Sequence, residues 1–345
     1  MCYIWRMVEV PIRDPLRDPL CFRAPLPYTT RVFPYGFPAD IAANSLDAIE
    51  AARESWGAYG PRFDRPPIRV HVLVSEGNSV RPPEPVLRGQ RHLISWIADR
   101  ENFAVIDREQ RFGYSCVTSA TVADRVFFRW HFLDSLISLL LELNYITSLH
   151  AACVAWEGAG VLLFGESGAG KSTLSYACAR HGWTYISDDS SSIVWGSQTV
   201  LGNPHCFRFR ADAPEVFSEL RGLTVGYAMG RKPTMEVPTA NLPIRTAPDC
   251  RVERIVFLDR RAARNTDRRA GMARVDTDEV RRRLLQGMPV FDPVLEPQRK
   301  SLIELIAKMP AFELHYEHFE DAVRLLEEMM QDDEVDIASD RGTSR

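Results

Sequence analysis

Hydrophobic and polar positions divide the chain into two stretches with different patterns. In the first stretch, residues 67–77 alternate as a strand does, and residues 40–56 place apolar side chains at helical spacing. Residues 102–119 predict two strands around a polar turn. Residues 125–144 are apolar on almost every side and predict a buried helix. This mixture predicts an α+β domain.

From Tyr145 onward, short apolar strands alternate with helices. The pattern predicts strands over 148–156 and 159–165, a helix over 172–181 and another strand over 183–187. Further strands are expected at 201–210 and 251–260, followed by helix, strand and helix across 297–330. Such alternation is typical of an α/β sheet flanked by helices.

The boundary between the two stretches is placed near residue 145, and a chain of 345 residues has room for two domains. We therefore expect an N-terminal α+β domain of unknown role at 1–144 and an α/β domain at 145–330. Residues 331–345 are charged and small and are expected to be a disordered tail.

Composition excludes several classes of protein. Apolar residues make up 45% and charged residues 26%, which suits a globular fold, and the formal net charge of −4 argues against a nucleic-acid partner. Seven cysteines without a CxxC pair, and a start without a signal-peptide core, predict a cytoplasmic protein. The longest apolar stretch, 132–146, is too short and too interrupted for a membrane span.

A phosphate-binding loop carries the clearest chemistry. Gly165, four intervening residues, Gly170, Lys171 and Ser172 form a Walker A pattern between an apolar strand and a helix. Its backbone N–H groups and the helix N-terminus would cradle phosphate, with Lys171 on the β- and γ-phosphates and Ser172 on Mg²⁺. The alternative is a glycine-rich turn without a ligand. The residues expected to hold the nucleotide are Gly165, Glu166, Ser167, Gly168, Ala169, Gly170, Lys171, Ser172 and Thr173.

An aspartate pair follows at short distance. Asp188 lies 17 residues after Lys171, so one short helix and one strand separate the pair from the loop. Ligands bind at the carboxyl ends of strands in open α/β sheets, and a carboxylate there can hold a metal or take a proton. The alternative is that the pair caps a turn, where Asp is common.

The stretch from His150 to Asp189 resembles the C-terminal kinase domain of HPr kinase/phosphorylase, with a histidine, the loop "GVLLFGESGAGKS", a short helix and "DD" in that order. The resemblance implies a P-loop kinase-type sheet and a serine kinase that uses ATP and Mg²⁺. It implies that Asp188 is the acid/base residue, that Asp189 lies beside the metal and that His150 lines the site. His150 could instead be a buried histidine bonded to a neighbour.

The segment "ELRGLTV" (219–225) also resembles a family segment, which would make Glu219 a carboxylate on the metal side. Its distance from the aspartates is longer than in the family, and Thr224 replaces a glycine, so a solvated helix residue is the alternative for Glu219. The resemblance does not extend over 1–144. An acceptor other than HPr is therefore expected, a protein or peptide bearing a serine.

Two other functions stay open. One is a nucleotide-binding or ATPase sensor without kinase activity, although the chain has no guanine-reading Asn-Lys-x-Asp and its aspartates follow the loop helix at once. The other is a small-molecule kinase on the same fold, because the acceptor pocket cannot be recognised in the sequence. The sequence also leaves a homo-oligomer open.

Overall fold

The computed structural model describes residues 25–77, 81–210, 212–222, 234–259, 270–288 and 295–331. The chain folds as two compact units, Met1–Asn144 and Tyr145–Arg345, which we call the N-terminal unit and the P-loop unit. The tail expected to be disordered lies outside the described residues, apart from Gln331, which ends the last helix.

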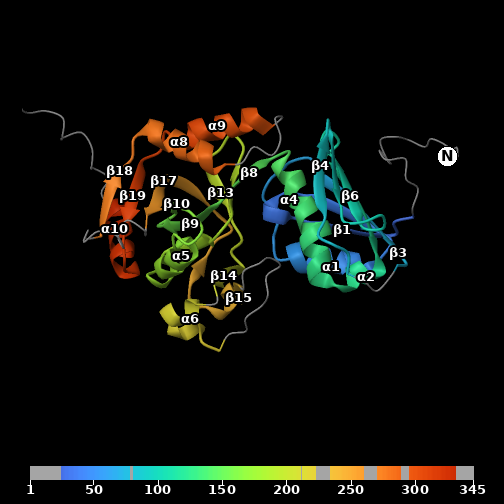
Figure 1. Ribbon diagram of the computed structural model, residues 1–345, viewed down its shortest axis with the longest axis horizontal. Helices are drawn as coiled ribbons and strands as arrows, with labels where there is room; N and C mark the ends of the chain where they lie inside the picture. Colours follow the sequence, from blue (N-terminus) through green and yellow to red (C-terminus); the bar gives the residue numbers. More distant parts are fainter. Residues whose placement is uncertain are drawn as a thin grey trace, which may run out of the picture. The chain divides into compact units, whose positions relative to one another are not determined.

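One mixed sheet of seven strands forms the N-terminal unit (Figure 1). The strands lie in the order β1-β2-β3-β7-β6-β5-β4. The β2–β3 and β3–β7 pairs are parallel and the other pairs are antiparallel. The strands are β1 (Tyr28–Val32), β2 (Ala39–Ala43), β3 (Ile68–Ser75), β4 (Val86–Gln90), β5 (Leu93–Ile97), β6 (Phe103–Asp107) and β7 (Phe112–Thr118).

Helices cover this sheet and give the unit the α+β character expected from the sequence. Helix α1 packs on β1 and β2, and α4 packs on β3, β6 and β7. The helical elements are a 3₁₀ turn η1 (Pro34–Gly36), α1 (Leu46–Trp56), α2 (Ser119–Ala123), α3 (Arg125–Phe128), a π-helix η2 (Arg129–Asp134) and α4 (Ser135–Glu142).

The helix predicted over 40–56 is wrong before Leu46, because residues 39–43 form β2 instead. In β2 the buried residues alternate with half-buried ones, with Ala39, Ile41 and Ala43 turned inward. The strand is bonded to β1 on one side and to β3 on the other. The pairing with β3 joins segments that are distant in the chain, and it outweighs the local helical spacing.

The P-loop unit contains a ten-stranded mixed sheet in the order β16-β11-β9-β10-β17-β13-β12-β8, with β19 beside β17 and β18 beside β19. Strands β14 and β15 form a separate pair. The strands are β8 (Ile146–Leu149), β9 (Ala151–Trp156), β10 (Ala159–Phe164), β11 (Thr184–Ser187), β12 (Ser191–Val194), β13 (Thr199–Leu201), β14 (Cys206–Arg210), β15 (Thr234–Pro238), β16 (Arg245–Thr246), β17 (Asp249–Asp259), β18 (Gly271–Arg274) and β19 (Ala311–His315).

Helices lie on both faces of this sheet, as expected for a P-loop kinase-type fold (Figure 1). Helices α5 (Lys171–Arg180) and α10 (Phe319–Gln331) share one core with Val161 and Leu163 of β10. Helices α8 (Thr277–Gly287) and α9 (Glu296–Ile306) share the other core with Leu162. Alternate residues of one strand thus point to opposite cores, which explains why the strands are apolar throughout.

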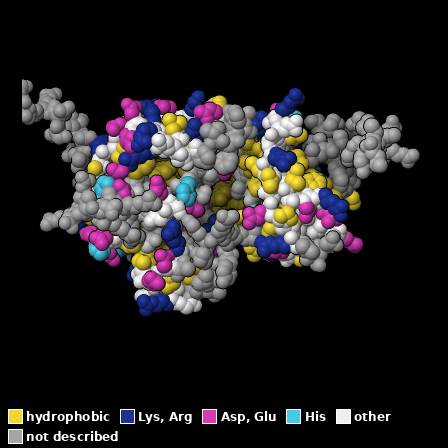
Figure 2. Space-filling view, viewed as in Figure 1, with side chains coloured by type: hydrophobic (Ala, Val, Ile, Leu, Met, Phe, Trp, Pro, Cys, Tyr) yellow, Lys and Arg dark blue, Asp and Glu magenta, His cyan; other side chains and the backbone are white. Residues whose placement is uncertain are grey.

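Charged side chains of both signs are interspersed over the described part of the face shown in Figure 2. This distribution agrees with the small net charge of −4. Every helix within the described residues is too short or too polar to cross a lipid bilayer.

Asp134, at the end of the π-helix, is a partly buried carboxyl group whose pKa generates a prediction. Its Oδ2 accepts a hydrogen bond from the Ser55 hydroxyl at 3.0 Å and lies 3.8 Å from Arg129 Nε. Burial raises its pKa from 3.8 to about 6, against the opposing effects of Ser55 and Arg129. The stability that the neutral form provides is therefore complete below about pH 4 and is lost as the pH rises through about 6.

We expect Asp134→Asn, which keeps the neutral form at every pH, to raise the free energy of unfolding at pH 8 by about 1–2 kcal/mol. The gain should vanish near pH 4. Denaturant titrations of the full chain between pH 4 and pH 8 measure this, with the exposed Asp64→Asn as the control. An equal gain at both pH values would contradict the assignment.

Candidate nucleotide-binding and phosphotransfer site

The phosphate loop joins the end of β10 at Phe164 to the start of α5 at Lys171. Gly168 and Gly170 adopt φ of +95° and +97°, which favours glycine. A Cβ on Gly170 would lie 2.6 Å from the Tyr316 hydroxyl, which donates to the Ala169 carbonyl at 3.1 Å. The loop conformation therefore requires glycine at both positions.

Lys171 lies inside the loop and is only 6% exposed. Its ammonium donates to the Gly165 carbonyl at 2.7 Å and contacts His150 Nε2 at 3.1 Å. Burial lowers the pKa of Lys171, whereas the charge of Asp189 raises it and the charge of Arg210 lowers it. The ammonium is thus held across the loop, where an anion can approach it.

His150 reaches the loop because of the direction of β9. This strand lies between β10 and β11 and runs antiparallel to both. The residue just before β9 therefore lies at the edge where β10 and β11 end. Because an ammonium only donates, His150 Nε2 accepts from Lys171. The other ring nitrogen, Nδ1, lies 3.3 Å from Asp189 Oδ1.

Asp188 follows the end of β11 and is 7% exposed. Its Oδ1 accepts from the Tyr185 hydroxyl at 3.2 Å and its Oδ2 from the Arg208 backbone N–H at 2.7 Å. Burial raises its pKa to about 6, although the Arg208 N–H opposes this, and the neighbouring Asp189 raises it further. A carboxylate with such a pKa is suited to accept a proton near neutral pH.

Asp189 differs from its neighbour because its side chain is 52% exposed. Ser172 is the second residue of α5. Its hydroxyl donates to the Asp188 main-chain carbonyl at 3.4 Å. Ser172 and Asp189 therefore offer a hydroxyl and a carboxylate oxygen on the same edge. The described residues contain no cluster of three or more metal-binding side chains. Two hard oxygen ligands nevertheless fit Mg²⁺, which usually binds few protein groups and completes its shell with water and phosphate.

The predicted site residues therefore meet at one edge of the sheet: the loop from Gly165 to Ser172, with Thr173 in the first turn of α5, and His150, Asp188 and Asp189. Glu166, Ser167 and Gly168 are exposed at the tip of the loop. Glu219 is engaged elsewhere, because its carboxylate pairs with Arg180 at 3.0 Å and accepts from the Tyr176 hydroxyl at 3.4 Å.

Sequence reasoning missed Arg210, at the end of β14. Its Nη2 donates to the Ser167 hydroxyl at 3.3 Å and would lie 3.4 Å from a Cβ on Gly168. Phe207 and Phe209 are buried, so the alternation of "FRFR" does predict that both arginines face away from the core. Only the pairing of β14 with β15 and the fold of the loop bring Arg210 to the phosphate site.

Sequence comparison relates the chain to a known protein. The chain matches an HPr kinase/phosphorylase of Lactobacillus delbrueckii subsp. bulgaricus at 34% identity over 100 residues, which covers 27% of this chain and 29% of that protein. The chain is similar to HPr kinase/phosphorylase. This confirms the resemblance expected from the sequence and suggests a P-loop kinase-like function. The matched part is less than a third of that relative.

A structure of the HPr(Ser) kinase/phosphatase from Coxiella burnetii covers 54% of this chain and 97% of its own, at 14% identity and a TM-score of 0.29. No family profile matches the chain.

Replacing Lys171 tests the phosphate loop. We expect Lys171→Ala to weaken ATP binding by about 10- to 100-fold, because a charge-assisted contact to phosphate is lost. Isothermal titration calorimetry measures the affinity, and the exposed Lys308→Ala is the control. The melting temperature of Lys171→Ala should stay within a few degrees of that of the parent protein. The contacts that Lys171 loses are offset because the cost of burying its charge is also removed. An unchanged affinity would mean that the loop does not bind the nucleotide.

Proposed function

We propose that the P-loop unit is an ATP-dependent kinase that phosphorylates a serine hydroxyl on a protein or peptide. The observation that carries the proposal is the contact chain from Lys171 through His150 to Asp189, with the buried Asp188 beside it. A phosphate loop by itself supports only nucleotide binding. A carboxylate with a raised pKa at the same edge adds a group that can accept the proton of an attacking hydroxyl.

The residues of the loop bind and orient the phosphates of ATP. The backbone N–H groups from Gly165 to Thr173 provide donors, and the N-terminus of α5 adds positive potential. Lys171 is proposed to exchange its contacts with Gly165 and His150 for the β- and γ-phosphates. Arg210 is proposed to bind the same phosphates from the opposite side of the loop tip.

Asp188 is proposed to take the proton of the acceptor hydroxyl. Each of its carboxylate oxygens accepts one hydrogen bond in the structure, and each keeps a lone pair for another. Tyr185 and Arg208 fix the orientation of the carboxylate, so little reorganisation is needed when the proton arrives.

Ser172 and Asp189 are the residues proposed to hold Mg²⁺, which when bound neutralises charge on the phosphates. His150 Nδ1 lies 3.3 Å from Asp189 Oδ1, and His150 is proposed to orient that carboxylate. His150 is thereby placed between the residue that binds phosphate and the residue proposed for the metal.

The acceptor is proposed to be a protein or peptide other than HPr, because the similarity covers only part of the chain and the N-terminal unit has a sheet of its own. ATP hydrolysis without transfer would instead indicate an ATPase sensor. Transfer to a metabolite hydroxyl would indicate a small-molecule kinase.

Two aspartate variants separate the proposed base from the proposed metal ligand. We expect Asp188→Asn to lower phosphotransfer by about 10²- to 10⁴-fold, which is the usual contribution of a general base, while ATP binding is retained. We expect Asp189→Asn to raise the Mg²⁺ concentration needed for half-maximal activity.

The assay follows γ-labelled ATP into a library of serine peptides at increasing Mg²⁺. If Asp188→Asn leaves transfer unchanged, Asp188 is not the base. If both variants shift only the Mg²⁺ requirement, the two carboxylates act together on the metal.

Arg210 gives a further prediction. Removing one preorganised donor to transition-state charge typically costs about 10²- to 10³-fold in kcat, so we expect a loss of this size for Arg210→Ala. Arg210→Lys should recover part of it, because the charge stays and the planar fork is lost. Steady-state kinetics measure kcat and KM, with Arg221→Ala as a control at an exposed arginine. Full activity of Arg210→Ala would contradict the role.

A further inference from the structure

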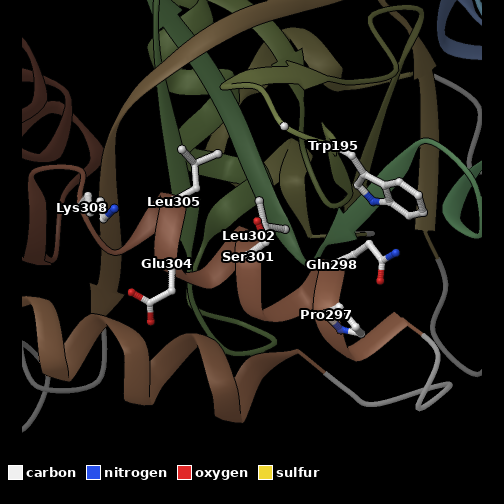
Figure 3. A pocket seen from close by; sticks show the side chains of 9 residues that line it. Trp195, Pro297, Gln298, Ser301, Leu302, Glu304, Leu305 and Lys308 are labelled. Carbon is white, nitrogen blue, oxygen red and sulfur yellow. The ribbon is translucent and has the colours of Figure 1, made fainter.

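Cavities lined by the described residues of the P-loop unit include two of similar volume. One, of about 510 Å³, lies between the turn at Trp195 and helix α9, where Leu302 and Leu305 line it (Figure 3). Its lining shares no residue with the phosphate loop. The other, of about 470 Å³, is lined by His150, Gly165 and Glu166. This second cavity, which we call the His150 cavity, is continuous with the proposed phosphotransfer site.

The wall of the His150 cavity is largely apolar. Leu149, Leu284 and Met288 are buried and provide apolar surface. The rings of Phe164 and Phe257 stand beside one another, with centroids 5.6 Å apart. The volume is within the range of about 300–1,000 Å³ that is typical of ligand sites. It has room for a large apolar side chain together with backbone on either side.

Positive charge in the described wall of the His150 cavity is compensated. Arg283 is its one lysine or arginine. The Arg283 guanidinium pairs with Glu279 at 2.6 Å and with Glu313 at 2.7 Å, and lies 5.0 Å from the centre of the Phe257 ring. These two ion pairs already neutralise the charge that would attract an anionic ligand. The cavity therefore favours a neutral, apolar occupant over an anionic one.

The position of Lys171 indicates whether the cavity faces the nucleotide or the acceptor. A P-loop lysine binds the β- and γ-phosphates. The Lys171 ammonium contacts Gly165 and His150, and both of these line the cavity. The cavity thus opens at the terminal-phosphate end of the nucleotide site. The base of the nucleotide extends from the other end of the phosphate chain, so the acceptor is the substrate that reaches this cavity.

We propose that the His150 cavity selects the acceptor by seating a large apolar side chain close in sequence to the phosphorylated serine. This inference rests on the proposed kinase function and adds the class of acceptor: a peptide segment with a leucine-, isoleucine-, methionine- or phenylalanine-sized residue near its serine. Burying such a side chain corresponds to a preference of about 10- to 100-fold over alanine.

Gly287 offers a way to alter the cavity without removing its wall. It is exposed at the end of α8, lines the cavity, and no described atom lies within 4 Å of where its Cβ would be. Gly287→Trp should fill the cavity, and Gly287→Asp should place a negative charge at its edge. Leu285→Trp is the matched control, because Leu285 is 47% exposed on the same helix and is not part of the lining.

The experiment uses the full chain, γ-labelled ATP, Mg²⁺ and a library of peptides with a central serine, in which one flanking position at a time is fixed. We expect the parent and Leu285→Trp to prefer a large apolar residue at one position by at least about tenfold. Gly287→Trp should lose this preference, and Gly287→Asp should shift it toward lysine or arginine. ATP affinity, measured on each variant by calorimetry, should stay unchanged.

Three results would overturn the inference. Labelling by the parent without an apolar preference at any position would refute the acceptor pocket and leave the kinase function standing. Loss of ATP affinity in Gly287→Trp, with the preference intact, would assign the cavity to the nucleotide base. Absence of label on every peptide with the parent enzyme would refute the proposed protein- or peptide-kinase function and this inference together.

Discussion

The site depends on the burial of one cation. The Lys171 ammonium is almost fully removed from water, and burial by itself disfavours its charged form. The Gly165 carbonyl and His150 Nε2 satisfy two of its three donors, and Asp189 supplies negative charge beyond the histidine. This arrangement keeps a cation in a position where phosphate would replace the polar partners. It also couples the phosphate loop to the strand edge that carries the aspartates.

The antiparallel strand β9 makes this coupling possible. Without it, β10 and β11 would be neighbours, and the loop and the aspartates would face each other directly. Because β9 lies between β10 and β11, the residue just before β9, His150, contacts Lys171 on one side and Asp189 on the other. Parallel pairing of β10 with β17 brings Phe257 to the same edge, beside Phe164. The His150 cavity therefore follows from the same strand order.

Local sequence predicted those parts of the fold that depend on local interactions. The Walker A residues, the short helix after them and the strand before Asp188 were placed correctly, because glycine spacing and apolar runs determine these elements locally. The alternation in 67–77 likewise marked β3. Strand β2 was assigned to a helix, since Ala and Ile fit either period and only its pairing with β1 and β3 decided the outcome. Strand β4, exposed along its whole length, carried no apolar alternation that could be recognised.

The sequence by itself determined that the chain holds a Walker A pattern followed closely by two carboxylates, because these groups lie within one continuous stretch. Tertiary structure decided how the two carboxylates differ. Asp188 is buried because Tyr185 and the backbone of Arg208 enclose it, whereas Asp189 stays half exposed beside His150. The tertiary structure also brought Arg210 to the loop and placed Arg283 between two glutamates. The contacts of Asp188 with Arg208, of Arg210 with Ser167 and of Arg283 with Glu313 join residues that are far apart in the chain, and burial and strand pairing determine them.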